Sequence, residues 1–180
     1  MSAVRRAPHL DLAECGCWHG HSTYLIARVL QLNGFRGQLH VFDSFLGLSE
    51  FTQVDGLEQF ATPEQVEEPR RHFASSEEHL RKLVEPFGFV RVHPGWIPSR
   101  FGEIQGKRLG FLSVDVDLYE PTRDSLRHLF PLLEDQATVY VDDCGYKTYP
   151  GARTAVEKHM AEHPGSVYFR MPFGSALIVK

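Results

Sequence analysis

Short apolar runs alternate along most of the chain with longer segments in which apolar residues recur three and four positions apart. The longer pattern is typical of amphipathic helices, and the short runs are typical of strands. The short runs predict strands at 10–14, 39–42, 89–92, 109–114 and 138–141. The periodic segments predict helices at 22–33, 76–87, 121–133 and 149–162. Two closing runs, 167–171 and 176–179, flank Pro172-Phe173-Gly174 and predict a hairpin.

This alternation predicts an α/β fold, a mostly parallel sheet of seven strands with helices on both faces and a C-terminal antiparallel hairpin. The 180 residues fit a single domain, 1–180. Residues 46–75 interrupt the pattern because they are polar and contain Pro63 and Pro69. We expect this excursion to hold one short helix and to act as a lid that shapes an acceptor pocket. Ligands of such sheets bind at the carboxyl ends of the strands, where the strand order reverses.

Charge and cysteine content narrow the class of protein. A net charge of −4 and a pI near 6.2 argue against the basic surface of a nucleic-acid-binding protein. No apolar run approaches the roughly 20 residues that span a bilayer, and Met1–Leu12 lacks the apolar stretch of a signal peptide. Cys15, Cys17 and Cys144 have no disulfide or zinc spacing and indicate free thiols. We therefore expect a cytoplasmic protein without nucleic-acid or membrane partners, and a homo-oligomer is compatible with the sequence.

A glycine-containing loop follows the first predicted strand. Gly16 and Gly20 come after Glu14, and a helix begins near Ser22. Glycine permits a tight turn and a close approach of the backbone to a ligand, and the N–H groups of the helix N-terminus face the same place. Two glycines in such a loop can also serve packing alone.

Asp43 ends the second predicted strand, 23 residues after Gly20. An acid binds ribose at an offset of about 20 residues in dinucleotide folds, and a ribose diol would supply the donors that a buried carboxylate needs. A turn closed by Asp43 into Ser44 is the alternative. The glycines are spaced more widely than in G-x-G-x-x-G, and Glu14 leads the loop. This suits a ligand with an amino acid and a sulfonium rather than a pyrophosphate.

Four carboxylates follow the fourth and fifth predicted strands. Asp115 and Asp117 follow the fourth strand, and Asp142 and Asp143 follow the fifth. If the strands are neighbours, Asp115 lies across from Asp142 and Asp143, and such carboxylates repel one another unless a cation lies between them. Oxygen-only ligands favour Mg²⁺. Helix capping is the alternative, with Asp117 serving the helix that begins near Pro121.

Several short motifs resemble those of the macrocin O-methyltransferase family, over about Leu12 to Lys180. They are Glu14-Cys15-Gly16 with Gly20, Phe42-Asp43-Ser44-Phe45 with Gly47-Leu48, Gly95-Trp96, Asp115-Val116-Asp117-Leu118-Tyr119-Glu120-Pro121-Thr122, and Val141-Asp142-Asp143 with Gly151-Ala152-Arg153. The resemblance implies the Rossmann-like class I methyltransferase fold. It also implies methylation of a sugar hydroxyl of a small natural product, with S-adenosylmethionine as donor and Mg²⁺ as cofactor.

The resemblance also implies roles for individual residues. The cofactor-binding residues would be Glu14, Gly16 and Ser22 at the methionine part, to which the loop pattern adds Gly20, and Asp43 and Ser44 at the ribose. The metal ligands would be Asp115, Asp142 and Asp143. We expect Asp115 also to accept the proton of the acceptor hydroxyl, because it lies at the strand end where cofactor and metal should meet. Two alternatives are a non-catalytic module that binds a nucleoside or a partner, and an NAD-dependent oxidoreductase, which the wide glycine spacing argues against.

Overall fold

The computed structural model describes residues 9–145 and 150–180. Its strands are β1 (Asp11–Cys15), β2 (Leu39–Asp43), β3 (Val90–Pro94), β4 (Leu109–Val114), β5 (Leu133–Val141), β6 (Val167–Arg170) and β7 (Ala176–Val179). Its α-helices are α2 (His21–Leu32), α3 (Pro63–His72), α4 (Glu77–Val84), α5 (Tyr119–Leu129) and α6 (Gly151–Glu162). Short 3-10 turns lie at Gln53–Asp55, Leu57–Gln59, Phe101–Ile104 and Phe130–Leu132.

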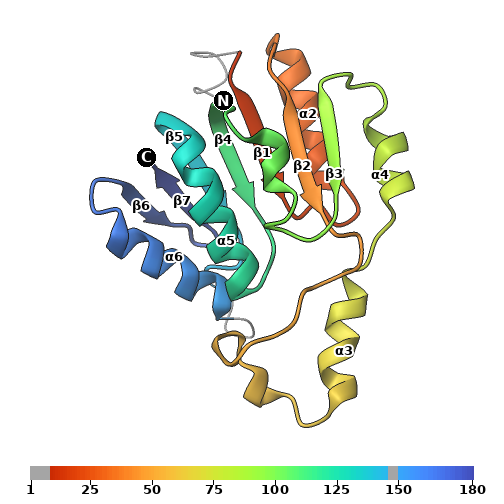
Figure 1. Cartoon of the computed structure of the whole chain (residues 1–180), viewed down its shortest axis with the longest axis vertical. Coiled ribbons are helices and arrows are strands. Elements are labelled where there is room, and N and C mark those ends of the chain that lie inside the picture. Colours follow the sequence, from red (N-terminus) through yellow and green to blue (C-terminus); the bar gives the residue numbers. More distant parts are fainter. Residues whose placement is uncertain (1–8, 146–149) are drawn as a thin grey trace.

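The strands form one sheet in the order β3-β2-β1-β4-β5-β7-β6 (Figure 1). Strands β1 to β5 pair in parallel, and β7 pairs antiparallel with both β5 and β6. The predicted fold class, with its C-terminal antiparallel hairpin, is confirmed. The order reverses between β1 and β4, which places the expected ligand site above these two strands.

Two hydrophobic cores cover the two faces of the sheet, because side chains alternate along each strand. Leu12 and Val41 belong to the core that packs against α2 and α4. Ala13 and Phe42, one position later in each strand, belong to the core that packs against α5 and α6. The sheet is thus covered on both sides, as the nearly continuous apolar strands predict.

Some element boundaries differ from the prediction. Strand β5 begins at Leu133 rather than at 138. Leu133 pairs with Leu109, but the register then shifts and resumes at Thr138, and the polar residues in between contribute no apolar pattern. Helix α5 begins at Tyr119, before Pro121, and ends at Leu129. Pro131 then lies in a 3-10 turn, as its missing N–H and fixed φ favour. The predicted start of α6 at position 149 lies outside the described residues.

The excursion 46–75 extends beyond the carboxyl ends of the parallel strands, where α3 lies apart from the other helices (Figure 1). The short helix expected there is confirmed. Thr62 caps it by accepting from Gln65 N, and Pro63 occupies the first turn. Leu48 and Phe51 form a third small core with Leu118, which follows β4. No helix of the described residues is long and apolar enough to cross a membrane.

Candidate active site

The loop after β1 lies directly on the end of β4. Gly16 has a φ of +81°, and a Cβ built on it would lie 1.7 Å from the carbonyl oxygen of Asp115. Gly16 N also donates to Phe42 O at 2.8 Å, and Asp115 N donates to Cys15 O at 2.8 Å. Only glycine fits a left-handed position this close to another backbone. Gly16 therefore brings the loop, β2 and β4 together at the point where strand order reverses.

Gly20 has a packing role that the sequence did not reveal. It is the N-cap of α2 with a φ of +82°, and its absent Cβ would lie 2.5 Å from Cδ1 of Leu80 in α4. Gly20 lines neither of the two cavities described below. The close approach that it permits is to α4, whereas Ser22 does line a cavity, as expected.

Asp43 holds the same loop from the other side. One carboxylate oxygen accepts from Cys17 N at 2.8 Å and Trp18 N at 3.0 Å. The other accepts from Phe45 N at 2.7 Å, which forms the turn considered as an alternative. Asp43 also lines the larger cavity beside Ser44. Its backbone bonds orient the carboxylate at the cavity wall and leave oxygen lone pairs for a ligand.

Glu14 is a buried acid with one unpartnered oxygen. Its side chain is almost completely buried, and Oε2 accepts from the Thr23 hydroxyl at 2.5 Å. Oε1 has no hydrogen-bond partner among the residues that the structure describes. Desolvation raises the pKa of Glu14 to about 7, against hydrogen bonds from Thr23 and Ser22 that lower it. An orphaned carboxylate oxygen of this kind calls for a donor from outside the protein.

Two adjacent cavities open above β1 and β4. The larger encloses about 890 Å³ including the space at its opening, against about 600 Å³ for the smaller. It is lined by Asp43 at the end of β2, Gly95 and Trp96 after β3, and Asp115 after β4. The smaller is lined by the loop residues His19, His21 and Ser22. Gly16, Trp18, Phe73, Asp115 and Asp117 line both. The ring of Trp18 lies 5.7 Å from that of Phe73, so the excursion and the glycine loop meet between the cavities.

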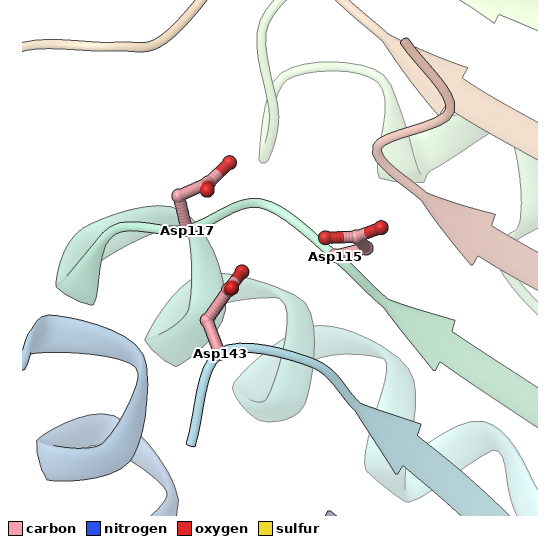
Figure 2. A group of neighbouring side chains, drawn as sticks. All are labelled: Asp115, Asp117 and Asp143. Atoms are coloured by element: carbon pink, nitrogen blue, oxygen red, sulfur yellow. The ribbon is translucent and has the colours of Figure 1, made fainter. Parts of the chain in front are cut away.

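Three carboxylates converge beside the cavities, and two of them, Asp115 and Asp117, line both cavities. Asp115 and Asp117 come from the segment after β4 and Asp143 from the segment after β5 (Figure 2). One oxygen from each lies within 4.8 Å of the others. Desolvation, followed by repulsion from neighbouring carboxylates, raises the pKa of Asp115 to about 7, of Asp117 to about 6 and of Asp143 to about 8. Such a cluster favours either bound protons or a cation.

This group differs from the predicted one in a single member. Asp115 and Asp143 come together as expected, but the third carboxylate is that of Asp117 rather than Asp142. Asp142 accepts instead from the Tyr140 hydroxyl at 3.1 Å, although its charge still contributes to the raised pKa of Asp115. Asp117 does not cap a helix either. The N-cap position of α5 is Leu118, one residue later, and its side chain makes no capping hydrogen bond. The D-x-D spacing of Asp115 and Asp117 was the available signal for Asp117.

A family model described as macrocin-O-methyltransferase (TylF) matches residues 4–165. The chain belongs to this family. Two curated relatives are similar to it. A demethyldecarbamoylnovobiocin O-methyltransferase of Streptomyces niveus is 31% identical over 84% of this chain and 58% of its own length. An 8-demethyl-8-(2,3-dimethoxy-alpha-L-rhamnosyl)-tetracenomycin-C 4'-O-methyltransferase of Streptomyces olivaceus is 32% identical over 74% and 52%.

Solved structures share the fold of this family member. The O-methyltransferase NovP superposes with a TM-score of 0.78 at 25% identity, covering 99% of this chain and 78% of its own. The O-methyltransferase TomG of Streptomyces achromogenes, solved with SAM, has a TM-score of 0.61 at 16% identity, covering 98% and 75%. The chain spans little more than half the length of the two curated relatives.

Proposed function

We propose that this protein is an O-methyltransferase that transfers a methyl group from S-adenosylmethionine to a sugar hydroxyl of a small natural product. The observation that carries the proposal is the convergence of three carboxylates beside two adjacent cavities, both of which Asp115 and Asp117 line. Membership of the family and the named activities of the two curated relatives, one of which acts on a rhamnosyl compound, support the same reaction. The acidic cavity mouth disfavours phosphate-rich acceptors such as nucleic acids.

The donor would occupy the two cavities in one orientation. The adenosine would take the larger cavity, where Asp43 and Ser44 would hold the ribose. The amino-acid end would take the smaller cavity, where the uncapped N–H groups at the start of α2 would face its carboxylate. Glu14 lines neither cavity, and its unpartnered oxygen would accept from the ammonium from behind the wall that Gly16 and Cys17 form.

The carboxylate cluster fits a divalent cation of the Mg²⁺ type. All its ligand atoms are carboxylate oxygens, which hard cations prefer. Among residues 9–145 and 150–180, no lysine, arginine or histidine forms an ion pair with Asp115 or Asp143, and burial together with the neighbouring carboxylates raises the pKa of both. Asp115 and Asp143 are assigned to the cation, with Asp142 as the third ligand predicted from sequence and Asp117 as the third favoured by proximity. When bound, a divalent cation lowers the pKa of an alcohol and fixes its direction.

The protein's own groups perform the remaining tasks. Methyl transfer forms an oxygen–carbon bond, breaks the carbon–sulfur bond and leaves S-adenosylhomocysteine. The cavity walls must align these three atoms, and orientation of this kind can contribute several kcal/mol. Asp115 would accept the hydroxyl proton, because it lines both cavities and therefore lies beside both the donor and the acceptor.

The proposal is tested by methyl transfer from labelled S-adenosylmethionine to a panel of deoxysugar glycosides and catechols. We expect transfer to a glycoside, its loss in EDTA and its recovery with Mg²⁺. Asp115→Asn should abolish transfer while S-adenosylhomocysteine still raises the melting temperature. Asp135→Asn, which removes an exposed acid of β5, is the matched control. Full activity of Asp115→Asn, or turnover undiminished by EDTA, would contradict the assigned roles.

The third ligand is decided by comparing two single variants. Mn²⁺ binding, followed by electron paramagnetic resonance, should weaken by at least about tenfold when the true ligand is replaced. Asp142→Asn should show this loss if the sequence assignment holds, and Asp117→Asn if proximity decides. Unchanged binding in both variants would remove the cation from this cluster.

A further inference from the structure

One buried carboxylate connects the excursion 46–75 to the segment that carries Asp117. We propose that Asp55 is a positioning residue that fixes Asp117 within the carboxylate cluster. The inference rests on the proposed function for the role of that cluster. It adds that the excursion sets the geometry of the reacting groups as well as forming a cavity wall.

Asp55 accepts hydrogen bonds from both sides of this junction. One of its oxygens accepts from Tyr119 N, the first residue of α5, at 2.6 Å. The other accepts from the backbone N of Thr52 at 2.9 Å and from the Thr52 hydroxyl at 2.6 Å. The side chain is fully buried. Asp55 therefore caps α5 from 64 positions upstream, because Leu118, the N-cap residue, offers no side-chain acceptor.

The charge of Asp55 is balanced by helix N-termini. Among the residues that the structure describes, no lysine, arginine or histidine forms an ion pair with it. Gly151, the first residue of α6, packs so closely that a Cβ would lie 1.8 Å from an Asp55 oxygen and 2.6 Å from Tyr119 N. The N-termini of α5 and α6 thus converge on one carboxylate, which their dipoles favour.

The residue before Tyr119 is held by the same excursion. Leu118 is fully buried and packs with Leu48 and Phe51 in the third core. Both residues that follow Asp117 are therefore fixed by groups of the excursion, Leu118 by apolar packing and Tyr119 by a hydrogen bond.

Asp117 itself sits in a conformation that needs this support. Its φ is +58°, and Leu118 N donates to Val116 O at 2.6 Å across it. A three-residue turn with a positive φ at a non-glycine centre is rare and strained. Such strain persists only when the surroundings over-determine the conformation. The fixation of Leu118 and Tyr119 supplies that constraint, and the turn then directs the Asp117 carboxylate toward Asp115 and Asp143 (Figure 2).

Asp55→Asn tests the coupling, because an asparagine side chain has only one acceptor oxygen. If that oxygen accepts from Tyr119 N, the NH₂ group faces the Thr52 donors; if it accepts from Thr52, the NH₂ group faces Tyr119 N. Hydrogen bonds to charged groups are stronger than those to neutral groups. We therefore expect the Tyr119 amide to exchange with solvent about tenfold faster or more, and Mn²⁺ to bind about tenfold more weakly. Affinity for S-adenosylhomocysteine should stay within about twofold, because the donor contacts lie on the ends of β1, β2 and β3. The Michaelis constant for the acceptor should rise more than that for the donor.

Glu58→Gln is the matched control, since it neutralises an exposed acid of the same excursion and should change none of these quantities. Unchanged Tyr119 exchange in Asp55→Asn would overturn the inference, and so would equal weakening of donor and Mn²⁺ binding. If Asp55→Asn does not fold, Thr52→Val removes one donor to the carboxylate. It should raise Tyr119 exchange by a smaller factor, and no rise would again overturn the inference. If the wild-type protein binds no Mn²⁺ but Tyr119 exchange still depends on Asp55, the proposed cation site is wrong. The structural coupling between Asp55 and the segment of Asp117 would still hold.

Discussion

The ionisation of Glu14 should make the stability of the ligand-free protein depend on pH. Burial raises the pKa of Glu14 from 4.5 to about 7. Between these values the folded protein keeps a proton that the unfolded chain has released, so the free energy of unfolding falls as pH rises. One pKa unit corresponds to about 1.4 kcal/mol, which gives a loss of about 3 kcal/mol between pH 4.5 and 8. Glu14 is fully buried, so solvent screening does not reduce this figure substantially.

Glu14→Gln isolates this contribution. The glutamine keeps an acceptor for the Thr23 hydroxyl and cannot ionise. The acids of the carboxylate cluster are present in both proteins and largely cancel in the comparison. Urea denaturation in EDTA at several pH values should show wild-type stability falling by about 3 kcal/mol more than that of the variant between pH 4.5 and 8. Parallel pH profiles would refute the assignment of a raised pKa to Glu14.

The same variant tests where the donor's ammonium lies. An ammonium opposite Glu14 stabilises the ionised form, so S-adenosylhomocysteine should bind wild-type protein more tightly as pH rises through about 7. Adenosine lacks the amino-acid group and should show no such increase. Glu14→Gln should remove the increase for S-adenosylhomocysteine, and an increase that survives in this variant would place the ammonium elsewhere.

Two further predictions concern the framework around the cavities. Gly16→Ala places a Cβ against the carbonyl oxygen of Asp115 at a φ of +81°. Chemical denaturation should show the free energy of unfolding reduced by more than about 2 kcal/mol. A reduction of less than about 0.5 kcal/mol would contradict the packing argument. The ring nitrogens of His40 and His93 lie 3.0 Å apart, and their outer nitrogens lie 3.3 Å from an Asp11 oxygen and 2.5 Å from a Glu103 oxygen, respectively. Filling these contacts with ionised carboxylates takes one neutral and one doubly protonated ring. Burial lowers the pKa of His40, so nitrogen NMR near neutral pH should show a neutral His40 ring with its proton on the nitrogen that faces Asp11, and a doubly protonated His40 would contradict this arrangement.

The fold could be predicted because its signals are local. Each parallel strand is a short apolar run and each covering helix has an apolar stripe, so alternation alone indicates a parallel sheet. The ends of these runs also collect the polar residues of the site, which is why Asp43 and Asp115 were found. The start of β5 was missed because Glu134, Asp135 and Gln136 lie where the register of the strand shifts and show no apolar pattern.

The parts of the site that sequence could not predict depend on contacts between distant segments. Gly20 looked like a ligand-approach glycine, but Leu80, sixty positions later, explains its missing side chain. Asp117 looked like a helix cap, and its direction depends on a left-handed turn held by Asp55. A pattern of residue types within one segment carries no information about such partners. The sequence therefore predicted that the two glycines and the four aspartates belong to the site, but it did not predict the role of each one.

The carboxylate cluster is a cost to the folded chain, and this supports a functional reading of it. Asp117 and Asp143 both adopt positive φ values, +58° and +59°, which glycine or asparagine would tolerate better. Both also have raised pKa values, so each ionised form is less favourable in the folded protein than in the unfolded chain. Folding alone would therefore favour other residues at both positions. Strain and repulsion that coincide at the mouth of two cavities are typical of a site shaped for a ligand rather than for stability, and a bound cation would offset the repulsion there.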